Sequence, residues 1–176
     1  SMHGAVCMPS RAMLLSGRSL FRIRENFQGL DTWPEAFRRA GYATFMTGKW
    51  HNGEPALKRI FPDSRAVFLG GMGWPYELPL NDVIAGELVN PRLSGEHSVK
   101  VFADRAGEFI RTRAKDAPDQ PWLCYVAFNL PHDPRVAPDD FRQRYKDAKM
   151  PLPPTFLAQH PLEIGSMTDR DELLER

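Results

Sequence analysis

Residues 42–53 read YATFMTGKWHNG, an apolar segment that passes into a basic and polar one. The apolar residues 42–46 predict a β-strand. This strand brings residues 47–53 to its carboxyl end, which is the edge where open α/β sheets bind their ligands. We therefore expect an α/β fold with a binding site built around this segment.

Two helices are predicted from their end signals. The first begins near Cys7 and ends before Gly17, since proline near the start and glycine just past the end are the usual pattern. This puts Cys7 at the positive end of a helix dipole. The second begins at Thr32, which forms a capping box with Glu35, and it stops at Gly41.

A second buried strand is predicted at residues 122–128, which read WLCYVAF. A continuous apolar run of this length is typical of a strand buried on both faces. Before it, a helix of about four turns begins at Ser98 and is broken at residues 116–120. Its stripe consists of Phe102, Ala106, Phe109, Ile110 and Arg113, and we assign the apolar part from Phe102 to Ile110 to the core. After it, the loop 129–135 lies at the carboxyl end of the strand.

The other parts of the chain give weaker signals. Residues 52–95 are rich in Gly and Pro and show no sustained period, which fits a functional wall or lid and fits a disordered loop equally well. A short helix is expected at residues 139–145, followed by a Pro-rich connector. Another capped helix is expected to begin at residues 168–171.

Composition favours one soluble globular domain. The chain has 176 residues, of which 42% are hydrophobic and 26% charged. No apolar run approaches the roughly 18 residues of a membrane span, and no signal peptide opens the chain. The net charge is +1, but residues 1–60 hold nine Lys/Arg against four Asp/Glu. A local basic excess of this kind suits a small anionic ligand better than nucleic acid.

Residues that can carry chemistry fall in three loops. Together they offer a nucleophile, cations for an anion, and two histidines for proton transfer, which are the groups needed to hydrolyse an anionic ester. They are Cys7 and Arg11, then Lys49 and His51, then His132 with Asp133 and Arg135.

The motifs around these residues resemble those of the type I, formylglycine-dependent sulfatases. Residues 7–11 read CMPSR and 15–18 read LSGR, similar to the signature whose cysteine becomes formylglycine. Residues 48–51, GKWH, resemble the family's second signature, and 131–134, PHDP, its Pro-His-x-Pro loop. The resemblance implies a three-layer α/β/α sandwich of the alkaline-phosphatase-like type, with residues 1–176 as part of the catalytic domain.

The resemblance also implies a role for each residue. Cys7, as formylglycine, would supply the nucleophile and a ligand to a divalent metal, usually Ca²⁺. Arg11 would steady the hydrated aldehyde, and Lys49 would bridge it to a sulfate oxygen. His51 would act as the base, and His132 would protonate the leaving oxygen. A maturation enzyme that converts Cys7 is an implied partner.

The chain also departs from the family pattern. In the family, further metal ligands lie on a strand before the cysteine and in segments after the Pro-His-x-Pro loop. Here six residues precede Cys7, and Asp169 and Asp171 near the end are explained by a helix start. We therefore expect the central part of a sulfatase, truncated at both ends, with Cys7 as the retained metal ligand.

Three functions stay open. The first is hydrolysis of sulfate esters, with carbohydrate or small alkyl sulfates as substrates. The second is hydrolysis of phosphonates or phosphodiesters by the same superfamily chemistry, and the third is a catalytically incomplete fragment. We expect no nucleic acid or membrane as partner, and relatives suggest export of the parent protein to the periplasm, the extracellular space or the lysosome. The sequence does not indicate the oligomeric state.

Other polar residues are assigned no role in the site. Cys124 is expected in the core, and a single disulfide between Cys7 and Cys124 is not favoured. Three histidines have no supporting context: His3, His97 and His160. Three arginines are assigned to a solvated face: Arg18, Arg22 and Arg24. For Asp133 and Arg135, contact with substrate and a salt bridge within the loop are both open.

Overall fold

The computed structural model describes residues 6–154, which fall into two units. The first ends at Ala137 and contains a five-stranded mixed sheet; the second begins at Pro138 and contains the short helix α5 (Asp139–Gln143). The strand order is β4-β3-β2-β1-β5, with β2, β1 and β5 parallel and β3 and β4 antiparallel. The strands are β1 (Ala43–Lys49), β2 (Ser64–Phe68), β3 (Pro79–Ile84), β4 (Glu87–Leu93) and β5 (Trp122–Ala127).

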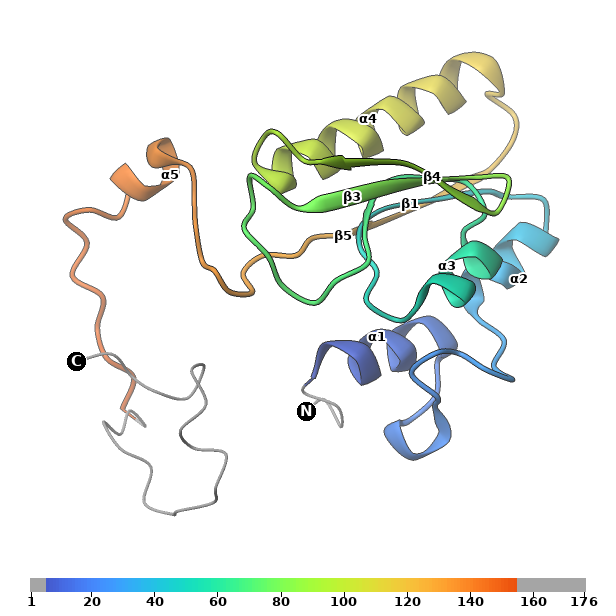
Figure 1. Ribbon diagram of the computed structural model, residues 1–176, viewed down its shortest axis with the longest axis horizontal. Coiled ribbons are helices and arrows are strands. Elements are labelled where there is room, and N and C mark those ends of the chain that lie inside the picture. The colour runs from blue at the N-terminus through green and yellow to red at the C-terminus, as the bar shows by residue number, and fades with distance from the viewer. Residues whose placement is uncertain (1–5, 155–176) are drawn as a thin grey trace. The chain divides into compact units, whose positions relative to one another are not determined.

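Helices cover both faces of this sheet (Figure 1). The long helix α4 lies along one face, and three shorter helices lie on the other. Their bounds are α1 (Cys7–Ser16), α2 (Trp33–Arg39), α3 (Glu54–Ile60) and α4 (Ser98–Asp116), with a 3₁₀ turn at Leu20–Arg22. The predicted three-layer α/β/α arrangement is confirmed.

Alternation along β1 explains the two layers of helices. The ring of Phe45 stacks on Phe109 of α4, with 4.5 Å between centroids. The next residue, Met46, is fully buried in the opposite core with Leu15 of α1 and Leu57 of α3. A strand that is apolar on both faces therefore requires helices on both sides.

The predicted helix ends are largely confirmed. Helix α1 begins at Cys7, and Gly17 follows it in the left-handed conformation, with its N–H donating to the Met13 carbonyl. Helix α2 begins after Thr32, but the predicted capping box is wrong in detail. The Thr32 hydroxyl donates to the Glu35 carboxylate at 2.7 Å, and it caps no backbone N–H. The Glu35 carboxylate also forms an ion pair with Arg59, so it pairs with side chains and not with the backbone of the helix end.

The irregular stretch expected at residues 52–95, as a functional wall or a disordered loop, contains regular structure. This segment contains α3, β2, β3 and β4, with loops between them. The elements are five to seven residues long, so none spans enough turns or alternations to give a period. Pro91 also argued against a strand at β4, because proline is rare inside strands. It is tolerated here because β4 lies at the edge of the sheet.

Strand β5 is less buried than predicted. Within the described residues it pairs with β1 and with no other strand, so it forms an edge of the sheet. Four of its residues are therefore half-buried, and Trp122 at its start is 41% exposed. The short helix predicted at 139–145 is α5, and the helix predicted at 168–171 lies outside the described residues.

An irregularity between β2 and β3 is held by Asp82. Ala66 has a positive φ of 51°, and its N–H donates to Asp82 Oδ1 at 2.9 Å in place of a ladder bond. Arg92 donates to the same oxygen at 2.9 Å, and Asn90 donates to the other. Burial alone would raise the pKa of Asp82, but these hydrogen bonds outweigh it and hold the pKa below its ordinary value.

Replacement of Asp82 should therefore cost stability in a pH-dependent way. Asp82→Asn is expected to lower the free energy of unfolding by about 1–3 kcal/mol at pH 7. A carboxylate with a lowered folded pKa stabilises the fold above its unfolded pKa of about 3.9, and the gain is lost as pH falls through the folded value. Urea denaturation of both proteins at pH 7 and pH 3 measures this. Equal stabilities at pH 7 would contradict it.

Candidate active site

Three segments meet at the carboxyl end of the parallel strands. They are the start of α1, the end of β1 with the residues that follow it, and the loop after β5. Helix α1 brings Cys7 to this edge, where its Sγ lies 3.1 Å from His51 Nδ1. These two residues are 44 positions apart in sequence, so the fold itself creates the contact.

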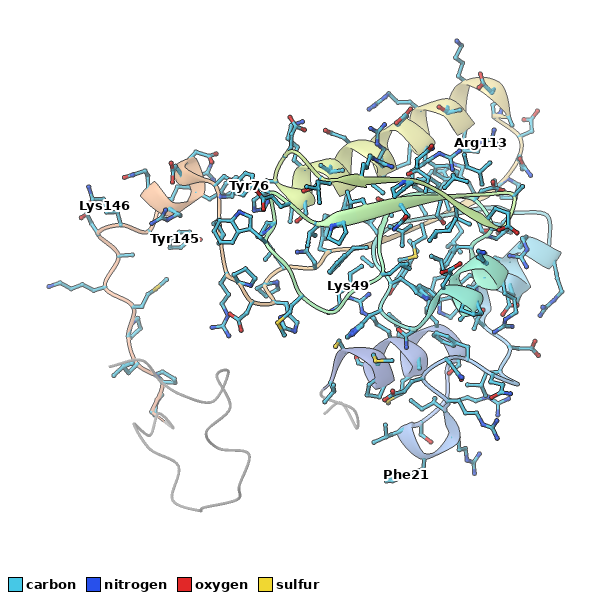
Figure 2. All side chains as sticks on the ribbon, in the orientation of Figure 1. Phe21, Lys49, Tyr76, Arg113, Tyr145 and Lys146 are labelled. Atoms are coloured by element: carbon cyan, nitrogen blue, oxygen red, sulfur yellow. The ribbon has the colours of Figure 1, made fainter. Side chains whose placement is uncertain are left out.

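Lys49 is the last residue of β1 and is 2% exposed. It lies between the sheet and α1 (Figure 2), and its ammonium group interacts with Cys7. Burial lowers the pKa of Lys49, the charge of Arg11 acts in the same direction, and Cys7 opposes both. A buried ammonium beside the nucleophile candidate is suited to an anionic ligand.

Arg11 is attached to two strands, β1 through Lys49 and β5 through Tyr125. One of its N–H groups donates to the Lys49 carbonyl at 2.8 Å. A second interaction joins it to the Tyr125 hydroxyl; burial raises the pKa of Tyr125, and Arg11 partly opposes this. The position of Arg11 on the first turns of α1 brings its charge to the same place as Cys7 and Lys49.

His51 has a constrained position. Its φ is 70°, and a Cβ on Gly71 would lie 2.8 Å from its ring atoms Cε1 and Nε2. A glycine at position 71 therefore lets the loop after β2 approach the imidazole. Burial lowers the pKa of His51, and the charges of Lys49, Arg11 and His132 add to the effect. The neutral imidazole is favoured and can accept a proton.

His132 lies in the loop after β5 and is half-buried. Its backbone N–H donates to the Asn129 carbonyl at 3.2 Å. Within the described residues its ring Nδ1 is buried and has no hydrogen-bond partner. His132 is close enough to His51 for the charges of the two rings to interact. In the same loop, Arg135 and Asp133 form an ion pair at 3.2 Å.

The remaining sequence assignments have mixed outcomes. Burial raises the pKa of the Cys124 thiol to about 11, as fits a half-buried cysteine in β5. His97 is buried and its Nε2 bonds to the Val136 carbonyl. The arginines of the predicted solvated face are exposed: Arg18, Arg22 and Arg24. Four residues lie outside the described part of the chain: His3, His160, Asp169 and Asp171.

Sequence reasoning missed three residues of the site. Gly48, with φ 104°, lies against the Ala127 backbone, and Gly71 lies against His51. Asn52 is 1% exposed and donates to two distant backbone carbonyls. The one available signal for Asn52 was its position directly after His51 in a loop predicted to bind ligand.

The described residues do not form a metal site by themselves. Among residues 6–154, no three or more His, Cys, Asp or Glu side chains form a cluster that could hold a metal ion. In the same part of the chain, no helix has the length and apolar character needed to span a bilayer.

The family model described as Sulfatase matches residues 1–176. The chain belongs to the sulfatase family. It is 30% identical to an arylsulfatase of Klebsiella aerogenes, over 78% of this chain and 36% of that protein. It is 27% identical to arylsulfatase J of Mus musculus, over 80% of this chain and 27% of that protein. It thus spans about a third of the length of these curated relatives.

Solved structures show the same fold. A protein solved with its substrate, D-glucosamine-2-N,6-O-disulfate, matches with a TM-score of 0.63 and 21% identity, over 87% of this sulfatase chain and 30% of that one. A putative sulfatase from Bacteroides fragilis matches with a TM-score of 0.66 and 17% identity, over 82% and 38% of the two chains. The family and the alkaline-phosphatase-like fold expected from the motifs are confirmed.

Proposed function

We propose that this chain carries the nucleophile end of an active site that hydrolyses sulfate esters. The observation that carries the proposal is the contact of Cys7 Sγ with His51 Nδ1 at 3.1 Å, beside the buried ammonium of Lys49. Membership of the sulfatase family supports the choice of sulfate among anionic esters. The arrangement combines a nucleophile position, a base and a cation within one small region.

Each residue has a proposed task. Cys7, once converted to formylglycine, would supply a hydrated aldehyde oxygen that attacks sulfur. His51 accepts a proton from the group at position 7, which it contacts. Arg11 steadies the hydrated aldehyde. Lys49 bridges it to a sulfate oxygen and neutralises charge there, an effect that is large where water is excluded. As the bond between sulfur and the ester oxygen breaks, its electron pair stays on that oxygen, which takes a proton from His132.

The sulfate now bound at position 7 would then leave by elimination. His51 takes the proton of the second hydroxyl, the bond between carbon and the sulfate oxygen breaks with its electron pair on the sulfate, and the aldehyde is restored.

A divalent metal, proposed as Ca²⁺, would complete the charge balance. Ca²⁺ prefers six to eight oxygen ligands, and of the described residues we assign it the modified Cys7. Lewis-acid stabilisation of a sulfate oxygen is the chemistry that such an ion supplies. The maturation enzyme that converts Cys7 is a further proposed partner.

The proposed substrates are sulfated carbohydrates or small alkyl sulfates. Two similar proteins support this class: the structure solved with a disulfated glucosamine, and a choline-sulfatase of Rhizobium meliloti that is 26% identical. Export of the parent protein remains part of the proposal.

Two measurements test the proposed function. In the natural protein that carries this sequence, mass spectrometry should show a loss of about 18 Da at Cys7, the change from cysteine to formylglycine. The same protein should hydrolyse glucosamine 6-sulfate or 4-nitrophenyl sulfate, and Cys7→Ala should lose at least about 10³-fold in rate. A preference for a phosphonate ester by orders of magnitude would favour the alternative chemistry. An unmodified thiol without hydrolysis of either ester would indicate a catalytically incomplete chain.

A further inference from the structure

Asn52 connects the two sides of the contact between Cys7 and His51. Its side-chain amide donates to the Met8 carbonyl at 2.9 Å and to the Glu25 carbonyl at 2.7 Å. Met8 is the neighbour of Cys7 in α1, and Asn52 is itself the neighbour of His51. The buried amide of Asn52, the residue after His51, is therefore bonded to Met8, the residue after Cys7.

The start of α1 has few other polar attachments in the described residues. Its N-cap, Val6, makes no side-chain capping bond, and its first turn holds no acidic residue. Apart from the interactions of Cys7 itself with His51 and Lys49, the next side-chain bond from α1 to the strands is that of Arg11, one turn further along. The bond from Asn52 to Met8 is therefore one of few side-chain bonds that attach the first turn of α1 to the residues after β1.

The orientation of this amide is fixed by its partners. Both acceptors are backbone carbonyls, which cannot donate, so the NH₂ group must face them. The Oδ1 atom is then buried, and within the described residues it has no hydrogen-bond partner. A buried acceptor without a partner costs free energy. Asn52 is thus not optimised for stability, because leucine, which has the same branched shape but is larger and apolar, would remove that cost together with the two bonds.

We infer that Asn52 is a positioning residue, whose two hydrogen bonds hold the start of α1 so that the group at position 7 meets His51. The inference rests on the proposed function, since it concerns the same nucleophile and base. It assigns Asn52 no contact with substrate. Its effect on rate comes through Cys7, where a displacement of about 1 Å can cost up to about 10²-fold.

Asn52→Leu in the natural protein tests the inference through rate and binding. We expect kcat for 4-nitrophenyl sulfate to fall about 10-fold or more, with KM within about twofold, once rates are normalised to formylglycine content. The melting temperature should stay within about 3 °C, because the lost bonds and the removed orphan oxygen offset each other. Asn52→Gln keeps both N–H donors and should retain at least about a third of kcat.

Hydrogen exchange supplies a readout that does not depend on sulfatase activity. In the 176-residue chain, Asn52→Leu should speed exchange of the amides in α1 about 10-fold, with α4 unchanged. The matched control is Asn81→Leu, at a half-buried asparagine of β3, which should change neither kcat nor exchange in α1. If the unaltered protein hydrolyses no sulfate ester, the proposed function fails, and the exchange measurement still tests the inference.

The outcomes are separable. Slower turnover with unchanged KM, unchanged melting temperature and faster exchange in α1 supports the inference. A leucine variant with the kcat of the unaltered protein, or with unchanged exchange in α1, overturns it. A leucine variant that does not fold also overturns it, because Asn52 would then serve the stability of the fold as a whole.

Discussion

Lys49→Met is expected to lower kcat/KM for a sulfate ester by about 10²–10³-fold. Lys49 is the most buried cation of the candidate site, at 2% exposure, and its ammonium group interacts with Cys7. In a region from which water is excluded, a fixed positive charge stabilises the charge that develops on the sulfate oxygens. Methionine keeps the length and volume of the side chain, so the loss reports the charge.

The same substitution should leave the fold as stable as before or make it more stable. A buried ammonium group is costly because it has lost its hydration, and no carboxylate among the described residues pairs with Lys49. Thermal unfolding of both proteins measures this. Lys100→Met is the matched control, since Lys100 lies on the exposed face of α4 and pairs with Glu96 and Asp104. A Lys49→Met protein with more than about a tenth of the original kcat/KM would contradict the assigned role.

The central part of the fold could be predicted because its signals are local. Strands β1 and β5 are apolar runs, and α1 and α4 carry a terminal glycine or an apolar stripe that identifies them. Strands β2 to β4 could not be predicted in this way. The N–H of Ala66, where β2 is irregular, donates a hydrogen bond to the side chain of Asp82, 16 residues away. A local sequence pattern cannot predict a bond between residues so far apart.

In the candidate site, too, residues with a local sequence signal could be predicted and residues that depend on distant contacts could not. Cys7, Lys49 and His51 could be found because reactive side chains follow strands or begin helices. The importance of Asn52 depends on carbonyl groups 44 and 27 residues away, which any residue type could supply. A hydrogen bond to a backbone carbonyl does not depend on the residue type that supplies the carbonyl. The role of Asn52 could therefore be found only from the structure.

Gly48 shows the same dependence on tertiary structure, and Gly48→Ala is expected to prevent stable folding. The φ of Gly48 is 104°, and β1 changes register against β2 between Met46 and Gly48. A Cβ at this position would lie 2.1 Å from the Ala127 carbonyl oxygen and 2.7 Å from its carbon. These are backbone atoms of the paired strand β5, which cannot move without breaking the ladder that carries both Lys49 and the loop of His132.

Gly41→Ala separates the clash from the strain of the backbone conformation. Gly41 has φ 90°, but nothing lies within 4 Å of its hypothetical Cβ. Its replacement should lower the free energy of unfolding by about 1 kcal/mol, the usual cost of a side chain in this region. The loss at Gly48 should exceed about 4 kcal/mol, which approaches the whole stability of a domain. Urea denaturation followed by circular dichroism compares the two variants, and similar losses would mean that the approach of β1 to β5 at Gly48 is not as close as the structure has it.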